Sequence, residues 1–252
     1  MARALVTGAT AGLGRAFAGR LAEAGWDLVL VARDAQRLGQ AAKELRRYAV
    51  DVDVLPADLD DDEDLGAVER RLGDDAEPVD MLVNNAGFAI RRDFMASSVD
   101  DEDRMLRVLV RAVLRLTHVA VHAMVRRGQG VVLNVSSVAG FAPQSTYNAA
   151  KAYVTTLTES VATDLHGTGV HVMAVCPGYT HTEFHDRAGI DKSNMPGVLW
   201  LDVDQVVDGA LADLRRGKVV SVPTLRYKLV AAGARLAPRA LVTAVSSRLG
   251  RG

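Results

Sequence analysis

The sequence has little of what a secreted, disulfide-stabilised protein needs. It contains a single cysteine, Cys176, so no disulfide can form within the chain, and such sequences are typical of reducing compartments. Cys176 ends the apolar run 172–176, where a small buried thiol is expected. The chain begins with the strand-like segment 3–7 instead of the longer apolar stretch of a signal peptide. We therefore expect a cytoplasmic protein.

Long hydrophobic runs and an excess of one charge are also lacking. No uninterrupted apolar segment is long enough to span a bilayer. The formal net charge of −1 gives no reason to expect a nucleic acid as partner. Aromatic residues make up only 5% of the chain and apolar residues 49%, so valine, leucine and alanine must fill the core. This composition suits a parallel sheet packed between helices.

The charges are unevenly distributed. After Asp213 there are nine basic residues and no acid, whereas the preceding part carries 31 acids and 21 bases. Such asymmetry can mark a tail that faces a membrane or a partner. Residues 225–230 and 238–245 combine apolar side chains with cations, as an interfacial helix does. Two interpretations stay open: a peripheral membrane contact, or a cover over the protein's own pocket or a neighbouring subunit.

Short apolar runs alternate with helical patterns along most of the chain. Strands are predicted over residues 4–7, 27–32, 51–55, 80–84, 131–136, 170–175 and 219–222. Helices are predicted over residues 13–24, 35–48, 61–72, 101–127, 147–166 and 204–216. Most of the strands are continuous Val/Leu-rich runs, as expected for strands buried on both faces. The alternation predicts an α/β fold, a doubly wound, Rossmann-like parallel sheet in three layers.

The chain has no Pro/Gly/Ser-rich linker and no internal repeat, which indicates a single domain. We place this domain at residues 1–222 and treat residues 223–252 as a basic, amphipathic extension, packed on the same domain or at an interface. The segment 179–200 lacks clean periodicity, and a long irregular stretch inside a compact domain is often a lid or a binding loop.

A glycine loop follows the first predicted strand and opens the first predicted helix. It has the spacing Gly8-x-x-x-Gly12-x-Gly14. Glycines at such a position let backbone amides approach a pyrophosphate at a helix N-terminus. The placement predicts a dinucleotide site. The residues of this loop expected at the cofactor are Thr7, Gly8, Thr10, Gly12, Leu13 and Gly14.

The end of the second strand bears on the choice of dinucleotide. Ala32 stands where a site for NAD usually offers an acid to the ribose 2′-hydroxyl, and Arg33 follows it. A guanidinium can pair with a 2′-phosphate, which favours NADP(H) over NAD(H). The alternative is that Arg33 is a solvated residue and Asp34 takes the hydroxyl. Asp58, followed by Leu59, either accepts a hydrogen bond from the adenine amino group or caps the next helix.

Tyr147 and Lys151 are four residues apart, and Ser137 precedes the tyrosine by ten residues. On a helix, positions i and i+4 project from one face, so a phenol and an ammonium can share a pocket. A free tyrosine has a pKa near ~10. A fixed cation beside it favours the phenolate and lowers that pKa, which suits proton transfer at neutral pH. Beside a dinucleotide, this pair predicts an enzyme of hydride transfer.

Taken together, the motifs resemble the short-chain dehydrogenase/reductase family in its single-domain form, up to about residue 222. The family's further signatures correspond here to 84–87 (Asn-Asn-Ala-Gly), 134–137 (Asn-Val-Ser-Ser) and 177–178 (Pro-Gly). The additional cofactor residues that the resemblance implies are Asn85, Ala86, Gly87, Tyr147, Lys151, Pro177, Gly178, Thr180 and Thr182.

The resemblance implies a reaction and a role for each catalytic residue. The reaction is the NADP(H)-dependent interconversion of a carbonyl and a secondary alcohol. Tyr147 would exchange the proton with the substrate oxygen, and Ser137 would hold that oxygen by a hydrogen bond. Lys151 would bind the nicotinamide ribose and lower the pKa of Tyr147. Relatives often form dimers or tetramers through helices equivalent to 101–127 and 147–166, so a homo-oligomer is expected.

The chain departs from the family pattern at two points. Leu109 stands where relatives carry a fourth catalytic residue, an asparagine that positions a water, and leucine has no hydrogen-bonding group. Slower turnover is the expected result. The spacing from Ser137 to Tyr147 is short, which should alter the substrate mouth. A catalytically weak nucleotide-binding regulator or scaffold is the alternative function, supported by Leu109 alone. The glycine spacing and the length of the chain speak against an epimerase or dehydratase of the extended relatives.

The irregular segment suggests the kind of substrate. Tyr179 and Phe184 are candidates for its wall, and the apolar content of the segment weakly favours an apolar substrate. The apolar residues concerned are Phe184, Met195, Val198, Leu199 and Trp200.

The spacing of two histidines and a glutamate could suggest a metal site. His181, Glu183 and His185 could be ligands on one helical face, but they follow a Pro-Gly turn and no further ligand stands out. No metal site is predicted. His118 and His122 are interpreted as surface or interface residues.

Overall fold

The structure of the chain is a computed structural model and describes residues 1–90, 94–184, 197–237 and 242. These residues form a seven-stranded sheet with the order β3-β2-β1-β4-β5-β6-β7, in which every neighbouring pair is parallel. The strands are β1 (Arg3–Thr7), β2 (Asp27–Ala32), β3 (Val52–Pro56), β4 (Met81–Asn84), β5 (Gly130–Val135), β6 (Val170–Val175) and β7 (Val220–Ser221). The predicted doubly wound parallel sheet is confirmed.

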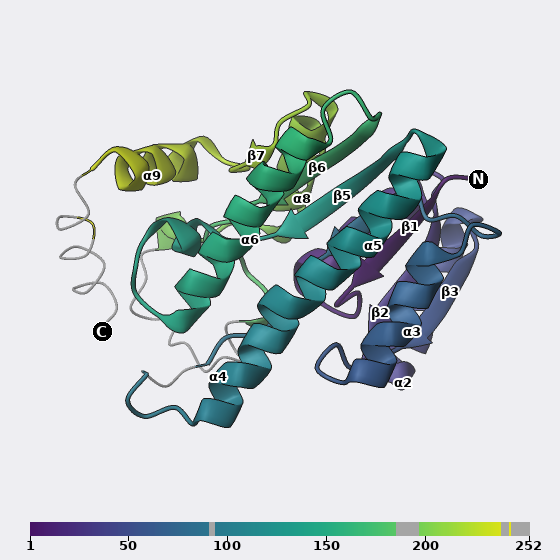
Figure 1. Cartoon of the computed structure of the whole chain (residues 1–252), viewed down its shortest axis with the longest axis horizontal. Coiled ribbons are helices and arrows are strands. Elements are labelled where there is room, and N and C mark those ends of the chain that lie inside the picture. The colour runs from purple at the N-terminus through teal and green to yellow at the C-terminus, as the bar shows by residue number, and fades with distance from the viewer. Residues whose placement is uncertain (91–93, 185–196, 238–241, 243–252) are drawn as a thin grey trace.

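Helices cover both faces of the sheet (Figure 1). They are α1 (Gly12–Glu23), α2 (Ala35–Leu45), α3 (Asp62–Gly73), α4 (Val99–Leu106), α5 (Ala112–Arg127), α6 (Thr146–Asp164), α8 (Val203–Arg215) and α9 (Leu225–Leu236). One apolar core joins α1, α2 and α8 to one face of the sheet, and a second joins α3, α5 and α6 to the other. Along β1, Ala4 and Val6 point into the first core and Leu5 into the second. Continuous apolar strands are needed because both faces are buried.

The predicted helix over 101–127 is longer and interrupted. It starts at Val99, where Ser98 is the N-cap and accepts a hydrogen bond from the Asp101 amide. Between α4 and α5 the segment Arg107–Arg111 is π-helical, and such a segment inside a helix is frequent at functional sites. Gly128, with φ 72°, ends α5 in a left-handed conformation.

By length and composition alone, one helix among the described residues could cross a membrane, namely Val99–Arg127. Half of its apolar window is buried inside the protein, and α5 packs on β4, β5 and α3. A core helix of a soluble protein passes the same test, so the finding is weak evidence for a membrane span.

The strand order reverses between β1 and β4, where successive connections leave for opposite faces of the sheet. In open α/β sheets, ligands bind outside the carboxyl ends of the strands at such a switch point. The loops that follow β1, β2, β4, β5 and β6 therefore form the candidate site.

Candidate active site

The glycine loop between β1 and α1 depends on left-handed backbone conformations. Gly8 has φ 67° and Gly12 has φ 53°. A Cβ atom on Gly14 would lie 2.4 Å from the Gly8 carbonyl oxygen, and one on Gly8 would lie 2.8 Å from the side-chain nitrogen of Asn85. These three positions therefore require glycine, and the loop has the tight path that its spacing predicts.

The N-terminus of α1 lacks a side-chain cap. Its N-cap residue, Ala11, makes no capping hydrogen bond. By contrast, the N-cap side chains of four other helices accept hydrogen bonds; they are Asp34 in α2, Asp61 in α3, Ser98 in α4 and Ser145 in α6. The first-turn amides of α1 remain available to an anion, which the helix dipole also favours. A pyrophosphate fits this end of the helix.

The Asn84–Gly87 segment holds the glycine loop in place. The hydroxyl of Thr7 accepts hydrogen bonds from the backbone amides of Asn85 (2.9 Å) and Ala86 (3.0 Å). The Asn85 side chain donates to the carbonyl oxygens of Thr7 (2.9 Å) and Gly8 (3.3 Å). Thr7 and Asn85 thus brace the loop. A Cβ on Gly87 would lie 2.6 Å from Leu109, so this glycine allows the segment to pack closely on the helical segment Val99–Arg127, called the long helix below.

A buried amide network lies beneath this segment. The Asn84 side chain donates to the Oδ1 atom of Asn134 at 2.9 Å, and Asn134 donates to Thr158 at 3.0 Å. Asn84 also donates to Thr117 of α5 at 3.2 Å. The network links β4 and β5 to α5 and α6. Buried amides whose hydrogen bonds are all made favour one particular packing of these elements. The roles of Thr117 and Thr158 were not predicted, although a threonine on the apolar face of a helix is the signal that could have indicated them.

Ser137, Tyr147 and Lys151 come together at the end of β5 and the start of α6. The Tyr147 hydroxyl is within hydrogen-bond reach of the Ser137 side chain. The Lys151 ammonium donates to the carbonyl oxygen of Val135 at 2.8 Å and lies 5.7 Å from the centroid of the Tyr147 ring. Ser137 also accepts a hydrogen bond from the Ala139 amide at 3.1 Å, which orients the serine. The three residues therefore lie close together at the carboxyl end of the sheet.

The expected lowering of the Tyr147 pKa by Lys151 is wrong: in this structure the pKa of Tyr147 is raised. Burial raises the pKa of Tyr147 above its ordinary value, and the hydrogen bond with Ser137 offsets only part of that rise. Burial also lowers the pKa of Lys151 to about 8. Desolvation therefore dominates both groups. At neutral pH the phenol is protonated, which is the form that can donate a proton.

Apolar side chains surround the Tyr147 ring. Met105 and Leu109 are fully buried and, with Ala150, form the cluster against which Tyr147 packs. Phe184 lies on another side, with its ring centroid 5.8 Å from that of Tyr147. Leu109, within the π-helical segment, offers only methyl groups at the position that the family pattern reserves for an asparagine.

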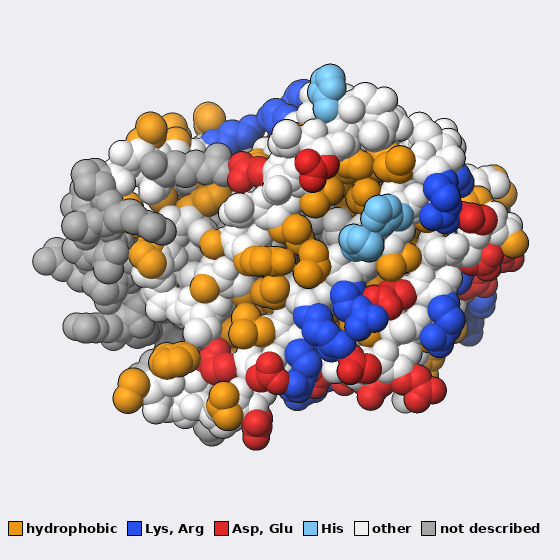
Figure 2. All heavy atoms as spheres, in the orientation of Figure 1, with side chains coloured by type: hydrophobic (Ala, Val, Ile, Leu, Met, Phe, Trp, Pro, Cys, Tyr) orange, Lys and Arg blue, Asp and Glu red, His pale blue; other side chains and the backbone are white. Residues whose placement is uncertain are grey.

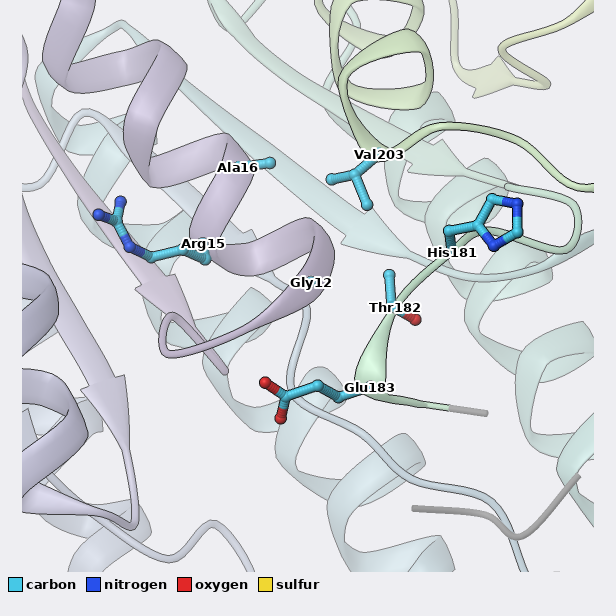
Figure 3. A pocket seen from close by; sticks show the side chains of 7 residues that line it. All are labelled: Gly12, Arg15, Ala16, His181, Thr182, Glu183 and Val203. Atoms are coloured by element: carbon cyan, nitrogen blue, oxygen red, sulfur yellow. The ribbon is translucent and has the colours of Figure 1, made fainter. Parts of the chain in front are cut away.

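The segment after β6 lies opposite the glycine loop and forms a second wall of the candidate site. The Pro177 carbonyl accepts a hydrogen bond from the Val138 amide at 3.0 Å, and the buried Thr180 hydroxyl donates to the Gly178 carbonyl at 3.0 Å. Figure 3 shows Thr182 and Glu183 facing the Gly12 turn across an open pocket. This pocket is lined by Gly12, Arg15, Ala16, His181, Thr182, Glu183 and Val203. Met195 lies outside the described residues, as does the side chain of Val198.

Tyr227 of α9 supports this wall. Its hydroxyl donates to the Leu199 carbonyl at 2.8 Å and accepts from the Tyr179 amide at 3.1 Å. A Cβ on Gly178 would lie 2.1 Å from the Tyr227 ring, so the glycine allows the ring to lie against the backbone. Trp200 packs against Tyr179 with ring centroids 5.7 Å apart. The role of Tyr227 was not predicted, because only the fold brings the tail to this place.

At the end of β2, Arg33 and Asp58 lie side by side. The Arg33 side chain is 61% exposed, and its guanidinium is 3.7 Å from the Asp58 carboxylate. Asp34 caps α2 by accepting a hydrogen bond from the Arg37 amide at 2.9 Å. The cap of α3 is Asp61, so Asp58 does not have the capping role that was its alternative. Leu59 is 6% exposed and packs in the core. Arg33 and Asp34 are both exposed here; Arg33 is paired with Asp58, and one carboxylate oxygen of Asp34 caps α2.

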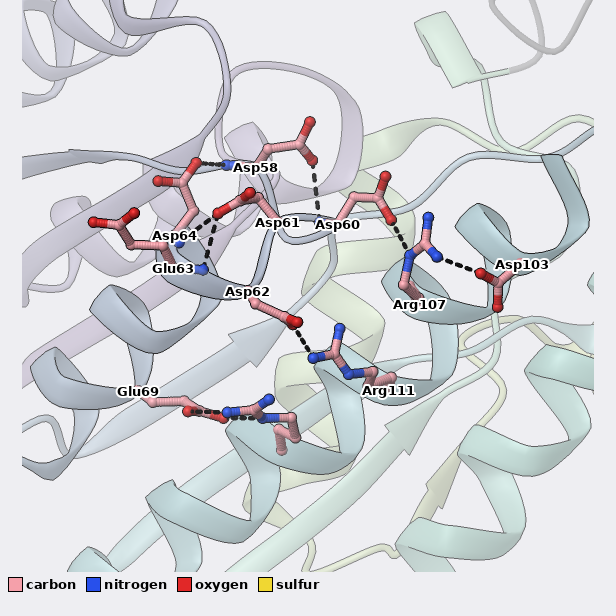
Figure 4. Close-up of polar contacts among 11 residues, drawn as sticks. Asp58, Asp60, Asp61, Asp62, Glu63, Asp64, Glu69, Asp103, Arg107 and Arg111 are labelled. Atoms are coloured by element: carbon pink, nitrogen blue, oxygen red, sulfur yellow. Dashed lines mark hydrogen bonds and ion pairs between the residues drawn. The ribbon is translucent and has the colours of Figure 1, made fainter. Parts of the chain in front are cut away.

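A ladder of arginines on the long helix faces a row of acids at the start of α3 (Figure 4). Arg107 pairs with Asp60 at 2.6 Å, and Arg111 pairs with Asp62. One turn further, Arg115 binds the two carboxylate oxygens of Glu69 through its Nε and Nη2 atoms. These pairs join segments that are more than 40 positions apart in the sequence, which periodicity does not reveal. The ladder ties the helical segment Val99–Arg127 to α3 and to the turn before it.

The histidines have partners other than a metal. His181 stacks on Trp200 with ring centroids 4.8 Å apart, and Glu183 pairs with Arg37. His185 lies outside the described residues. His118 and His122 are exposed, with their Nε2 atoms 3.1 Å apart. Among the described residues, no group of three or more candidate ligands is found.

The switch point, the uncapped helix and the braced glycine loop define an α/β protein that binds a dinucleotide at the carboxyl end of its sheet. The family model for short chain dehydrogenases matches residues 2–192. The chain belongs to the short-chain dehydrogenase/reductase family, as its motifs suggest, and is an oxidoreductase of that family.

Relatives of known name agree with this assignment. Sulfoacetaldehyde reductase 2 of Chromohalobacter salexigens is 39% identical over 187 residues, which cover 71% of this chain and 73% of that protein. Gluconate 5-dehydrogenase of Gluconobacter oxydans is 32% identical over 227 residues, which cover 83% and 86%. A solved short-chain dehydrogenase from Sphingobium yanoikuyae, in complex with NADPH, is 39% identical, with a TM-score of 0.86 and coverage of 93% and 94%. A bulky-bulky ketone specific alcohol dehydrogenase from Comamonas testosteroni is 33% identical, with a TM-score of 0.81 and coverage of 92% of each chain.

Proposed function

We propose that the chain interconverts a carbonyl and a secondary alcohol, with NADP(H) as the hydride carrier. The observation that carries this proposal is that Ser137, Tyr147 and Lys151 come together at the same carboxyl edge of the sheet as the open N-terminus of α1. The nicotinamide would supply or take the hydride, which is the chemistry that this cofactor carries in oxidoreductases. The chain's own residues bind, orient and move the proton.

Tyr147 is the proposed proton carrier, and Ser137 the proposed ligand of the substrate oxygen. The Tyr147 phenol is protonated at neutral pH, and burial raises its pKa further, so this residue can donate its proton to a carbonyl oxygen. Ser137 would hold the same oxygen and offset its developing charge. The Lys151 ammonium, already within the pocket, is the proposed ligand of the nicotinamide ribose.

Arg33 supports the choice of NADP(H). It is exposed at the end of β2, with its guanidinium 3.7 Å from Asp58, and Asp34 uses one carboxylate oxygen to cap α2. The solved relative from Sphingobium yanoikuyae is bound to NADPH. The proposed dinucleotide contacts are otherwise those of the glycine loop, the Asn85–Gly87 turn and the segment from Pro177 to Thr182.

The proposed substrate is fairly apolar. Phe184 lies against Tyr147, and Tyr179, which is close enough to affect the pKa of Tyr147, packs against Trp200. Apolar side chains of the helical segment Val99–Arg127 and of α6 cover another side of the Tyr147 ring. A structural relative is named for its specificity for bulky-bulky ketones, which supports the same class here.

Assembly into a homo-oligomer is part of the proposal. Leu114 and Val125 on α5 and Tyr153 on α6 are about 40% exposed. Figure 2 shows apolar side chains gathered over these two helices. The division into a catalytic domain over 1–222 and an extension over 223–252, the cytoplasmic location and a membrane contact of the tail stay predictions.

An assay of NADPH oxidation with a panel of ketones tests the proposal, with Tyr147→Phe as the matched variant. We expect turnover with apolar ketones and a loss of about 10²–10⁴-fold in the variant, the range of general acid catalysis. The alternative, a nucleotide-binding regulator, is favoured by Leu109 alone. NADPH binding without any turnover that depends on Tyr147 would support that alternative.

A further inference from the structure

An ion pair spans the mouth of the candidate cofactor site. Arg37, on the first turn of α2, binds Glu183 of the segment after β6, with guanidinium–carboxylate distances of 2.8 and 3.2 Å. The two residues are 146 positions apart. Both oxygens of the carboxylate are engaged, which is the strong bidentate form of this contact. Glu183 is also one of the residues that line the pocket in front of Gly12.

Arg37 also touches the glycine loop. Its Nη2 atom, which donates to Glu183 at 2.8 Å, also donates to the carbonyl oxygen of Thr10 at 3.4 Å. Arg33 stands at the end of the neighbouring β2, with its guanidinium 3.7 Å from Asp58. Two cations therefore border the place between the glycine loop and the end of β2, and each is paired with one carboxylate. In this fold, the adenosine ribose binds at that place.

We infer that Arg37 is a second cation for the ribose 2′-phosphate and that Glu183 is the carboxylate that the phosphate displaces from it. This inference rests on the proposed function and extends its cofactor specificity. A phosphate carries more charge than a carboxylate and offers three acceptor oxygens to the planar guanidinium. Arg37 would exchange its partner without leaving its place beside Thr10.

The displaced carboxylate links cofactor identity to the substrate side. Glu183 is followed directly by Phe184, whose ring centroid is 5.8 Å from that of Tyr147. Thr182 precedes it and approaches the Gly12 turn, where a Cβ would be 3.1 Å from its methyl group. The carboxylate that leaves Arg37 therefore belongs to the same segment as the ring that lies against Tyr147.

A plainer interpretation is that Arg37 and Glu183 form a static brace between α2 and the segment after β6. The two interpretations predict different binding. If the pair is only a brace, its loss should change the affinity for every nucleotide that contacts this segment, whether or not a 2′-phosphate is present. A competing carboxylate affects only ligands that carry the phosphate.

The test measures binding of adenosine 2′,5′-bisphosphate and of 5′-AMP by calorimetry at low ionic strength, since salt screens exposed pairs. These probes differ only in the 2′-phosphate. Glu183→Gln should tighten the bisphosphate by about two- to five-fold, the value of an exposed pair that no longer has to be broken. Arg37→Gln should weaken it by about ten-fold or more, as expected when charged hydrogen bonds are lost. Neither variant should change 5′-AMP by more than about two-fold.

The matched control is Glu44→Gln. Glu44 pairs with Arg15 at 2.6 Å on the same rim, and Arg15 lines the same pocket. This variant removes one negative charge without releasing Arg37, so the bisphosphate affinity should stay within about two-fold of the wild type. Arg37→Lys keeps the charge but not the planar fork and should recover only part of the affinity.

Equal changes for the two probes, or a Glu183→Gln variant that binds the bisphosphate no better than the wild type, would overturn the inference. Such a result leaves the proposed function standing if ketone turnover persists. Conversely, a chain that binds the bisphosphate as described but reduces no ketone would overturn the proposed function and not this inference.

Discussion

Replacement of Lys151 by methionine should change how the stability of the protein depends on pH. Burial lowers the pKa of Lys151 from 10.5 to about 8. The folded state therefore holds the charged ammonium less well than the unfolded state does. Its unfavourable contribution is fully present below about pH 8 and is relieved as the pH rises toward 10.5, because the unfolded chain then binds more protons.

The size of the effect follows from this pKa. Each pH unit between the two values is worth about 1.4 kcal/mol, so Lys151 should add about 2 kcal/mol to the free energy of unfolding from pH 8 to about pH 9.5. The range stops below pH 10 because burial raises the pKa of Tyr147 from 10.0. Above that value the unfolded tyrosine ionises first, and stability falls again.

Urea unfolding at several pH values, followed by circular dichroism, measures this dependence. The wild type should gain about 2 kcal/mol more than Lys151→Met over the range, whatever the stabilities of the two proteins at pH 8. Lys43→Met, at an exposed position on α2, controls for the loss of one positive charge. Parallel curves for the wild type and Lys151→Met would refute the view that desolvation dominates the charges of this site.

Three other substitutions test the geometry of the site. Gly14→Ala should abolish nucleotide binding in a fluorescence titration, because the new Cβ would lie 2.4 Å from the Gly8 carbonyl oxygen; normal binding would contradict the tight loop. Tyr227→Phe should lower the free energy of unfolding by about 1–3 kcal/mol, since two hydrogen bonds are lost, and should raise the KM for the ketone; an unchanged KM would separate α9 from the substrate wall. Arg33→Asp should weaken NADPH by about ten-fold or more and leave NADH nearly unchanged in the same titration, whereas equal losses would remove the basis for NADP(H).

The sequence predicts the sheet well because the sheet is simple to recognise. Strands buried on both faces must be continuous apolar runs, and β2 and β6 have the predicted bounds. The glycine loop is equally readable, since left-handed conformations and close backbone contacts leave only glycine at Gly8 and Gly12. The approach of Tyr147 to Lys151 follows from helical pitch alone.

Other features need the fold because they join distant segments. The arginine ladder pairs Arg107 with Asp60, and the buried network pairs Asn84 with Asn134, but the sequence contains no signal of which acid or amide meets which partner. Tyr227 contributes to the wall formed by the segment after β6. It belongs to the C-terminal tail, for which the sequence left two interpretations open. The pKa of Tyr147 is a further case: spacing indicates a nearby cation, whereas its depth of burial, which decides the direction of the shift, depends on the packing around it.

The most direct measurement is the rate of NADPH oxidation by the wild type and by Tyr147→Phe, with the same apolar ketone under the same conditions. If a protonated phenol delivers the proton in this pocket, the wild type turns over and the variant, still folded and still binding NADPH, does not. Equal rates for the two proteins would contradict the account, because the reaction would then proceed without the group around which the site is built.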